Sequence, residues 1–341
     1  MTRPASPRTA RQGLDRDDAF ADSTAVLDQE PANALAGVDR FRALVLEGLA
    51  RPDKRLPTEF FYDERGSALF DAICDLPEYY VTRTELALMA EYAGAMADAV
   101  GPGASIIELG SGSSTKSRLL LDALDRPRSY VPVDISREHL EATAVGLRRQ
   151  YPAIEILPVA GDFMRPLPLP AVPAPRVVYF PGSTIGNFER PRAIALLESM
   201  RHMAGPGGAV LVGIDLMKSP TILEPAYDDA AGVTAEFNLN LLHRINRELG
   251  ADFEPMRFRH RAFVDDAQSR VVMTLVSTCA QIVTVAGQRF RFRDGESIVT
   301  EYSHKYRPHD FALMARAAGL RVDRAWTDER QWFAVELLRP A

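Results

Sequence analysis

Short apolar runs alternate with amphipathic stretches through the central part of the chain. The apolar runs predict strands at 105–109, 129–133, 154–159, 176–181 and 208–214. Between them, apolar residues at helical spacing predict helices at 115–124, 136–149 and 190–204. Continuous apolar strands separated by helices are typical of a parallel sheet that is buried on both faces. The pattern therefore predicts an α/β fold.

The pattern changes on both sides of this region. A helical stretch at 221–248 precedes alternating segments at 258–265, 269–286 and 289–293, which predict antiparallel strands. A helix at 308–318 and strands at 321–326 and 332–338 predict a hairpin that closes the parallel sheet, so the strands before it are interpreted as an insertion. Ahead of residue 105, helices are predicted from about residue 38, at 68–74, and from a cap at Thr82 or Thr84 to about Val100.

Composition limits the kind of protein. The 341 residues include 46% apolar and 25% charged residues, as in an ordinary folded protein, and the net charge of −6 argues against nucleic acid or an anionic membrane as partner. No apolar run is long enough to span a membrane, and the N-terminus lacks the apolar core of a secretory signal. With only two cysteines and no metal-ligand spacing among its histidines, the chain is expected to be a cytoplasmic monomer without a metal. Residues 1–35 have no periodic apolar pattern, and we expect a mobile tail.

A glycine turn follows the first predicted parallel strand. The stretch Glu108-Leu-Gly-Ser-Gly112 leads from strand to helix, and this geometry offers free backbone N–H groups to a nucleotide-like ligand. A dinucleotide fingerprint needs a third glycine at position 115, where this chain has Thr115. The acidic Glu108 suits a ligand with a cationic amino-acid end. The turn therefore favours S-adenosylmethionine over a dinucleotide, and a methyltransferase over a dehydrogenase.

Polar residues follow the next three strands as well. Asp134 can accept hydrogen bonds from ribose hydroxyls, although it can also cap the following helix. Asp162 and Phe163 can hold adenine by its edge and face, although an Asp in a turn is common. Asn187, in a glycine-containing loop after the fourth strand, offers a donor and an acceptor to a methyl acceptor, or forms a simple Asx turn. These residues are consistent with a two-substrate site at one edge of the sheet.

Six motifs occur in order from about residue 40 to the C-terminus. They are Phe60-Phe-Tyr-Asp-Glu-Arg-Gly-Ser67, Leu76-Pro-Glu-Tyr-Tyr80, Glu108-Leu-Gly-Ser-Gly112, Gly182-Ser-Thr-Ile-Gly-Asn187, Ala226-Tyr-Asp-Asp-Ala-Ala-Gly-Val-Thr-Ala235 and Thr300-Glu-Tyr-Ser-His-Lys305. Together they resemble the histidine-specific Nα-methyltransferase family of ergothioneine biosynthesis. The chain departs from relatives at Pro181, where Leu is more familiar, and at His304 and Tyr306, where Cys and Phe are frequent.

The resemblance implies a fold and a donor site. The fold would be a class I methyltransferase, Rossmann-like with a mostly parallel sheet and a closing antiparallel hairpin, plus an inserted α+β substrate-binding domain. Residues 81–214 and 303–341 would bind S-adenosylmethionine, and residues 36–80 and 215–302 would form the substrate-binding domain or lid. The residues expected to contact S-adenosylmethionine are Gly110, Lys116, Asp134, Asp162 and Phe163.

The resemblance also implies the acceptor. Methyl groups would pass to the α-amine of L-histidine, up to Nα,Nα,Nα-trimethylhistidine (hercynine), in the first step of ergothioneine biosynthesis. Tyr62 and Asn187 would orient the amine as the catalytic pair. The substrate-binding residues would be Asn187 and Tyr227 at the amino-acid backbone, and Tyr79, Glu301, Tyr302 and Ser303 at the imidazole.

Two alternatives compete with this interpretation. One is a methyltransferase of the same family that acts on another amino acid, and the other is a non-catalytic module that binds S-adenosylmethionine. The polar set at positions 62, 187, 227, 301 and 303 argues against the second alternative, because an idle site has no physical need for all five residues. The presence of Glu301 and Ser303 favours histidine as the acceptor.

Overall fold

The computed structural model describes residue 1, residues 29–112 and residues 114–341. These residues form two compact units, of which one ends at Ala43 and the other runs from Leu44 to Ala341. The first helix, α1 (Gln29–Ala50), begins earlier than the position near residue 38 where the sequence predicted it. Most of the predicted mobile tail, residues 2–28, lies outside the described residues.

The main sheet of the second unit has the strand order β12-β13-β6-β5-β1-β2-β3, with β4 also paired to β2. Neighbouring strands from β6 to β3 are parallel, whereas β13 runs antiparallel to both β6 and β12. The predicted α/β fold with its closing hairpin is therefore confirmed. The strands are β1 (Ser105–Leu109), β2 (Ser129–Asp134), β3 (Glu155–Ile156), β4 (Val159–Ala160), β5 (Arg176–Phe180), β6 (Ala209–Asp215), β12 (Leu320–Thr327) and β13 (Phe333–Pro340).

Helices cover both faces of this sheet. The sheet grows in one direction from β1 through β2 and in the other from β1 through β5 and β6. Because strand–helix–strand crossovers are right-handed, the helices of the two halves lie on opposite faces. One face packs on α6 and α9 through a single apolar core, and α3 and α4 pack against each other. The helices are α2 (Glu64–Cys74), α3 (Tyr80–Val100), α4 (Thr115–Ala123), α5 (Arg137–Gln150), α6 (Arg190–Ala204) and α9 (Pro308–Ala317).

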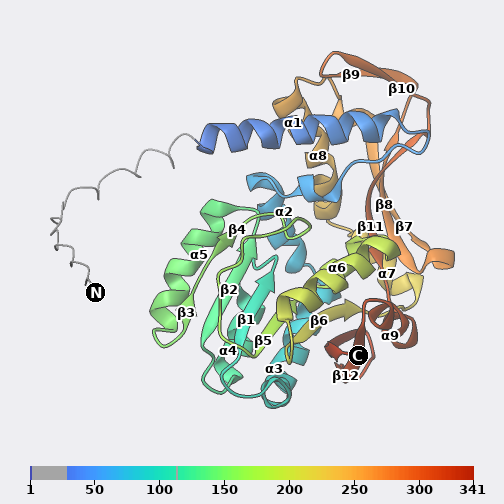
Figure 1. The fold of residues 1–341 in the computed structure, drawn as a ribbon. Helices are drawn as coiled ribbons and strands as arrows, with labels where there is room; N and C mark the ends of the chain where they lie inside the picture. Colours follow the sequence, from blue (N-terminus) through green and yellow to red (C-terminus); the bar gives the residue numbers. More distant parts are fainter. Residues whose placement is uncertain (2–28, 113) are drawn as a thin grey trace. The chain divides into compact units, whose positions relative to one another are not determined.

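A second, antiparallel sheet has the strand order β11-β8-β7 and lies apart from the parallel strands in Figure 1. Its outer strands β7 and β11 alternate buried and accessible residues, whereas every residue of the central strand β8 after Arg270 is buried. This sheet and the hairpin of β9 and β10 correspond to the predicted insertion. The elements are α7 (Pro220–Tyr227), α8 (Val233–Leu249), β7 (Phe258–Asp265), β8 (Arg270–Ser277), β9 (Gln281–Val285), β10 (Gln288–Phe292) and β11 (Ser297–His304).

Several predicted elements differ from those observed. The strand at 154–159 is interrupted between β3 and β4, where Pro158 has no N–H for the ladder. The helix at 221–248 is split into α7 and α8 by a turn that ends at Gly232, whose φ is +77°. The strand at 269–286 is split into β8 and β9 by a bend in which Ser277 Oγ donates to Cys279 O (2.9 Å).

Two further differences concern the acceptor motifs. The sequence did not predict β11, which carries Glu301 and Ser303 and pairs with β8. Helix α3 begins at Tyr80 rather than after a threonine cap, since Thr82 Oγ1 donates to Cys74 Sγ (3.3 Å) instead of capping the helix.

None of the described helices has the length and apolar character required to cross a bilayer. The predicted division into an S-adenosylmethionine-binding domain and a substrate-binding domain stays a prediction.

Candidate functional site

The glycine turn lies at the carboxyl end of β1, where the direction of sheet growth changes. Such a switch point leaves a crevice in which doubly wound proteins bind their ligands. Gly110 and Gly112 adopt φ values of +70° and +48°, a region that strongly favours glycine. Gly110 N donates to Val133 O (2.8 Å) and Gly112 N to Asp134 Oδ2 (3.0 Å), so the turn is tied to the end of β2.

Asp134 combines the two roles that the sequence left open. Its Oδ2 accepts from Gly112 N and its Oδ1 accepts from Ser136 N (3.0 Å) before α5. Each carboxylate oxygen has two lone pairs, so both oxygens can accept a further hydrogen bond from a ligand. Asp134 therefore shapes the turn while it stays able to bind hydroxyl groups.

Phe163 covers the glycine turn from the next loop. A Cβ added at Gly110 would lie 3.7 Å from Phe163 Cε1, in ordinary van der Waals contact. The Phe163 ring packs edge-on against Phe180, with 5.5 Å between ring centroids. Asp162 Oδ1 accepts from Met164 N (2.9 Å), which holds this loop in its turn. An aromatic face and a carboxylate thus lie beside the glycine turn, as expected for a site that binds a flat base.

Lys116 and the loop after β5 meet at a buried acid that the sequence analysis missed. Glu85 of α3 is fully buried, and its carboxylate forms an ion pair with Lys116 Nζ. The same carboxylate accepts from Gly182 N at 2.9 and 3.0 Å. A Cβ at Gly182 would lie 3.3 Å from Lys116 Nζ, so glycine allows the lysine to approach. The signal in the sequence was an acid within the apolar stripe of α3, beside Leu88.

Glu108 does not have the position that its motif suggested. Its side chain is 1% exposed, and its carboxyl group accepts from Ser117 Oγ and Tyr130 OH. Strand alternation explains this, because Ile107 and Leu109 face the α6 core and Glu108 faces the opposite side. Burial raises the pKa of Glu108 to about 7. The expectation that this carboxylate faces a cationic ligand group is therefore wrong, and Glu108 instead ties α4 to β2.

A cluster of aromatic residues forms a second part of the site. We use the name tyrosine cluster for Tyr62, Tyr79 and Tyr227 together with Phe70. The ring centroids of Tyr62 and Phe70 lie 5.6 Å apart, those of Phe70 and Tyr79 6.3 Å, and those of Tyr79 and Tyr227 6.2 Å, all edge to face. Burial raises the pKa of Tyr62, of Tyr79 and of Tyr227; the charge of Glu301 adds to this effect as a smaller contribution, and Lys305 opposes it at Tyr227. The three tyrosines and Phe70 therefore form a continuous row of edge-to-face rings.

Glu301 and Ser303 lie two residues apart on β11 and share one face of the strand. Burial raises the pKa of Glu301 to about 7, against the opposing charge of Lys305. Ser303 is 5% exposed, and its Oγ lies 2.8 Å from Tyr227 OH. One face of β11 therefore presents the Glu301 carboxyl group and, next to it, the hydroxyl pair of Ser303 and Tyr227.

Tyr302 lies on the other face of β11. The guanidinium carbon of Arg270 lies 3.7 Å from the centroid of the Tyr302 ring, and the guanidinium carbon of Arg55 lies 5.0 Å from the same centroid. Arg270 also pairs with Glu189 Oε1 at 3.3 Å, just before α6. The structure therefore does not bring Tyr302 to the tyrosine cluster, and its contacts connect the insertion to the main domain.

Asn187 lies in the loop that follows β5 of the main sheet. It is the last residue of the short helix η2 (Thr184–Asn187), which packs against β11. Gly186 allows this packing, since a Cβ there would lie 2.7 Å from His304 O. Gly186 thus serves the approach of η2 to β11.

Polar contacts hold the two loops that carry Tyr62 and Tyr79. Asp63, next to Tyr62, accepts from Gly66 N (2.8 Å), Asn240 Nδ2 (2.8 Å) and Arg247 Nη2 (2.7 Å).

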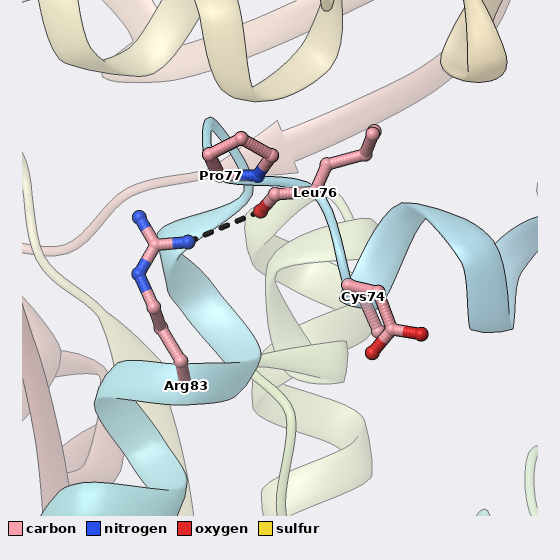
Figure 2. Close-up of a pocket in the computed structure, with 5 residues that line it drawn as sticks. Cys74, Leu76, Pro77 and Arg83 are labelled. Carbon is pink, nitrogen blue, oxygen red and sulfur yellow. Dashed lines mark hydrogen bonds between the residues drawn. The ribbon is translucent and has the colours of Figure 1, made fainter.

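In the second loop, Arg83 Nη1 donates to Leu76 O (3.1 Å) and Tyr79 O (3.2 Å). Figure 2 shows this arginine reaching from α3 across a surface hollow whose other lining residues are Cys74, Asp75, Leu76 and Pro77. Each tyrosine is therefore positioned by the fold before any ligand binds.

A histidine supports the third tyrosine. His260 Nε2 lies 2.8 Å from Tyr227 O, and His260 Nδ1 lies 2.8 Å from Asn238 Nδ2. Because the carbonyl oxygen can only accept, Nε2 carries the proton and Nδ1 accepts from the amide. Burial lowers the pKa of His260, which is consistent with a neutral ring.

A buried polar network behind Tyr227 was also missed. Asp215 ends β6 and is fully buried, and its carboxylate accepts from Tyr80 OH (2.7 Å), Lys218 Nζ (2.6 Å) and Lys305 Nζ (2.7 Å). The available signal was its position, since Asp134 likewise ends a strand at the same edge of the sheet. No group of three His, Cys, Asp or Glu side chains within the described part of the chain is arranged to hold a metal ion.

Comparison with known proteins identifies relatives of this chain. A family profile described as histidine-specific, SAM-dependent methyltransferase matches residues 41–340. The histidine N-alpha-methyltransferase of Mycobacterium tuberculosis is 41% identical over 307 residues, or 89% of this chain and 95% of that protein. The protein of the same name from Mycolicibacterium smegmatis is 41% identical over 315 residues, or 90% of this chain and 98% of that protein. Ergothioneine biosynthesis protein 1 of Neurospora crassa is 32% identical over 298 residues, which are 80% of this chain but 32% of that longer protein.

Proposed function

Because this chain belongs to the family of histidine-specific, S-adenosylmethionine-dependent methyltransferases, we propose that it methylates the α-amine of L-histidine. The transfer proceeds up to Nα,Nα,Nα-trimethylhistidine (hercynine) and is the first step of ergothioneine biosynthesis. The monomeric state and the cytoplasmic location expected from the sequence are part of this proposal.

One observation carries the choice of histidine. Glu301 is half-buried on β11, two residues from Ser303, whose Oγ lies 2.8 Å from Tyr227 OH, and no hydrogen bond to the Glu301 carboxyl group is found among the described residues. A carboxylate in this position accepts a hydrogen bond from an imidazole N–H, while Ser303 lies on the same face of β11. A site that hydrogen-bonds a ring N–H rejects analogues that would leave its polar groups unpaired.

The residues at the glycine turn fit S-adenosylmethionine. Gly110 allows close backbone approach, Asp134 keeps lone pairs for ribose hydroxyls, and the Phe163 ring supplies a face for adenine, with Asp162 beside it. Lys116 lies next to the loop after β5, where its charge suits the carboxylate of the methionine part. When bound, S-adenosylmethionine supplies an electrophilic methyl group on a positively charged sulfur.

The acceptor residues position the amine. In this proposal Tyr62 and Asn187 hold the α-amine by hydrogen bonds, Asn187 and Tyr227 hold the amino-acid backbone, and Tyr79 lies against the ring. A strong general base is not required, because alignment of two reactants supplies much of the rate enhancement. The uncharged tyrosine hydroxyls, whose pKa values are raised, are suited to orient an amine rather than to deprotonate it.

The direct test is a product analysis. The purified protein is incubated with S-adenosylmethionine and each of the standard amino acids, and the products are weighed by mass spectrometry. We expect one, two and three methyl groups on histidine and none on the others. Methylation of a different amino acid would support another acceptor, and binding of S-adenosylmethionine without any product would support a non-catalytic module.

A variant pair tests the role of Glu301. We expect Glu301→Ala to raise KM for histidine at least about tenfold while KM for S-adenosylmethionine changes less than about twofold. Asp294→Ala, an exposed acid of the same insertion, serves as the control and leaves both constants unchanged. Equal changes of both KM values in Glu301→Ala would indicate a structural role.

A further inference from the structure

A buried ammonium group lies directly behind the tyrosine–serine pair of the proposed acceptor site. The Lys305 side chain is 1% exposed, and its Nζ donates to Asp215 Oδ2 (2.7 Å), Tyr227 OH (2.7 Å) and Ser303 Oγ (2.8 Å). An ammonium group has three N–H donors and no acceptor. All three donors of Lys305 are therefore used, and each of its three partners must accept.

The protons of the two hydroxyl groups can now be counted. Tyr227 OH and Ser303 Oγ lie 2.8 Å apart, so one of them donates its proton to the other. The second proton cannot point toward Lys305, which has no lone pair. No other acceptor for it occurs among the hydrogen bonds of the described residues. This proton is left to be offered outward, on the side of Glu301 and the tyrosine cluster.

We infer that Lys305, anchored by Asp215, is a positioning residue that makes the Tyr227–Ser303 pair a hydrogen-bond donor toward the substrate. Without the ammonium group, each hydroxyl could turn its proton inward to the space that Lys305 occupies. With it, inward donation is excluded, and the polarity of the pair is set before the substrate binds. The device belongs to the general class of preorganised polar groups that fixed charges orient.

Asp215 keeps the ammonium group charged and in place. Burial alone would neutralise both partners, but the facing charge of Asp215 raises the pKa of Lys305, and Lys305 and Lys218 together lower that of Asp215. Lys218 Nζ also binds Tyr80 OH (2.8 Å) and Leu216 O, and it has no contact with Tyr227 or Ser303. The two lysines therefore share one carboxylate, but only Lys305 touches the hydroxyl pair.

The inference rests on the proposed function and makes its specificity more definite. Glu301 supplies an acceptor, and the hydroxyl pair on the same side of β11 supplies a donor. A neutral imidazole presents the complementary set, one ring N–H and one ring nitrogen with a lone pair. An imidazolium ring, which has two N–H donors, leaves the outward hydroxyl proton without an acceptor. The structure thus points to the neutral ring as the form that is bound.

Two lysine variants separate this role from a general contribution to folding. Lys305→Met removes the ammonium group from the hydroxyl pair, while Lys218 and Tyr80 still satisfy Asp215. We expect KM for histidine to rise about tenfold and KM for S-adenosylmethionine to stay within about twofold. Lys218→Met removes an ammonium group from the same carboxylate and is expected to leave KM for histidine within about twofold, with both melting temperatures as a control. Equal effects of the two variants on KM for histidine would overturn the inference.

A double-mutant cycle tests whether Lys305 acts through the hydroxyl groups. In a background that carries Tyr227→Phe and Ser303→Ala, Lys305→Met should change KM for histidine less than about threefold, because no hydroxyl is left to orient. An undiminished effect of about tenfold in this background would refute the inference. If Lys305→Met does not fold, Lys305→Gln takes its place, since its amide oxygen can accept the outward proton and should weaken histidine binding in the same way.

The cycle also distinguishes a failure of this inference from a failure of the proposed function. If the wild-type enzyme methylates another amino acid, the same variants are measured with that amino acid. In that case the proposed specificity for histidine is wrong. The double-mutant cycle, measured with the other amino acid, still supports or refutes the role of Lys305. If the wild-type enzyme methylates none of the standard amino acids, both proposals are wrong.

Discussion

Glu336 is an unpaired acid in the core of the main sheet, and the structure predicts how much its ionisation lowers the free energy of unfolding. It lies on β13 opposite Val212 of β6, and it is 2% exposed. Ala334 and Leu338, two residues to either side, belong to the apolar core on the α6 face, so the side chain of Glu336 points into that core. Its Oε2 is buried and has no hydrogen-bond partner among the described residues.

The cost follows from the protonation of this group. Burial raises the pKa of Glu336 from the ordinary 4.5 to about 7. The folded protein therefore binds the proton more tightly than the unfolded chain. A tenfold difference in proton affinity corresponds to about 1.4 kcal/mol, so ionised Glu336 destabilises the fold by about 3 kcal/mol. The stability that protonated Glu336 retains is fully present below pH 4.5. It is lost as the pH rises through about 7 and the group ionises.

The assay is urea unfolding of the wild type and Glu336→Gln at several pH values. The amide has nearly the same shape but does not ionise. We expect the free energy of unfolding of the variant, relative to wild type, to increase by about 2 to 3 kcal/mol between pH 5 and pH 8. Glu329→Gln, an exposed acid shortly before β13, should show no such trend. A constant difference between Glu336→Gln and wild type across this pH range would refute the reasoning.

Three further predictions concern the site. Glu85→Gln removes the charge shared by Lys116 and the Gly182 loop, so KM for S-adenosylmethionine and KM for histidine should both rise, each by about tenfold; a change in only one would contradict this. Gly186→Ala should raise KM for histidine more than KM for S-adenosylmethionine, because its Cβ would lie 2.7 Å from the β11 backbone, whereas Gly94→Ala, with open space around it, should be neutral in steady-state assays. Burial raises the pKa of Glu301 to about 7, so its ionised fraction falls about fivefold from pH 7 to pH 6. The value of kcat/KM for histidine in wild type, divided by the value in Glu301→Gln, should fall by the same factor. A pH-independent ratio would show that Glu301 does not titrate in this range.

The parallel part of the fold was predictable because its central strands β1, β2, β5 and β6 are buried on both faces. A continuous apolar run such as that of β6, in which every residue from Ala209 to Asp215 is buried, leaves few alternatives. The breaks at Pro158 and Gly232 were visible as residue types, but their effect depended on which neighbouring strand or helix required a backbone N–H there. Strand β11 was missed, although it alternates buried and accessible residues.

The candidate site was predictable where a motif carried it and not where a contact spans the fold. The structure connects Tyr62, Tyr79 and Tyr227 through aromatic contacts and places Ser303 beside Tyr227, while the roles of these residues in substrate binding stay predictions. It shows in addition that Glu108 faces away from the glycine turn, which strand alternation could have indicated. The burial of Lys305 against Asp215 joins residues 90 positions apart. No local pattern distinguishes such a lysine from a solvated one.

The separate origins of the two halves of the site have a consequence for the evolution of this fold. The glycine turn and its partners come from one continuous stretch of the main domain, whereas Glu301 and Ser303 lie on a strand of a different sheet. Tyr302 packs on the opposite face of that strand, where its ring stacks on Arg270. If Glu301 and Ser303 bind the acceptor as proposed, they can be randomised together in a library while the residues proposed to bind the methyl donor stay constant. A duplicated copy of such a gene could acquire a new amino-acid acceptor through few substitutions, with its donor chemistry inherited unchanged.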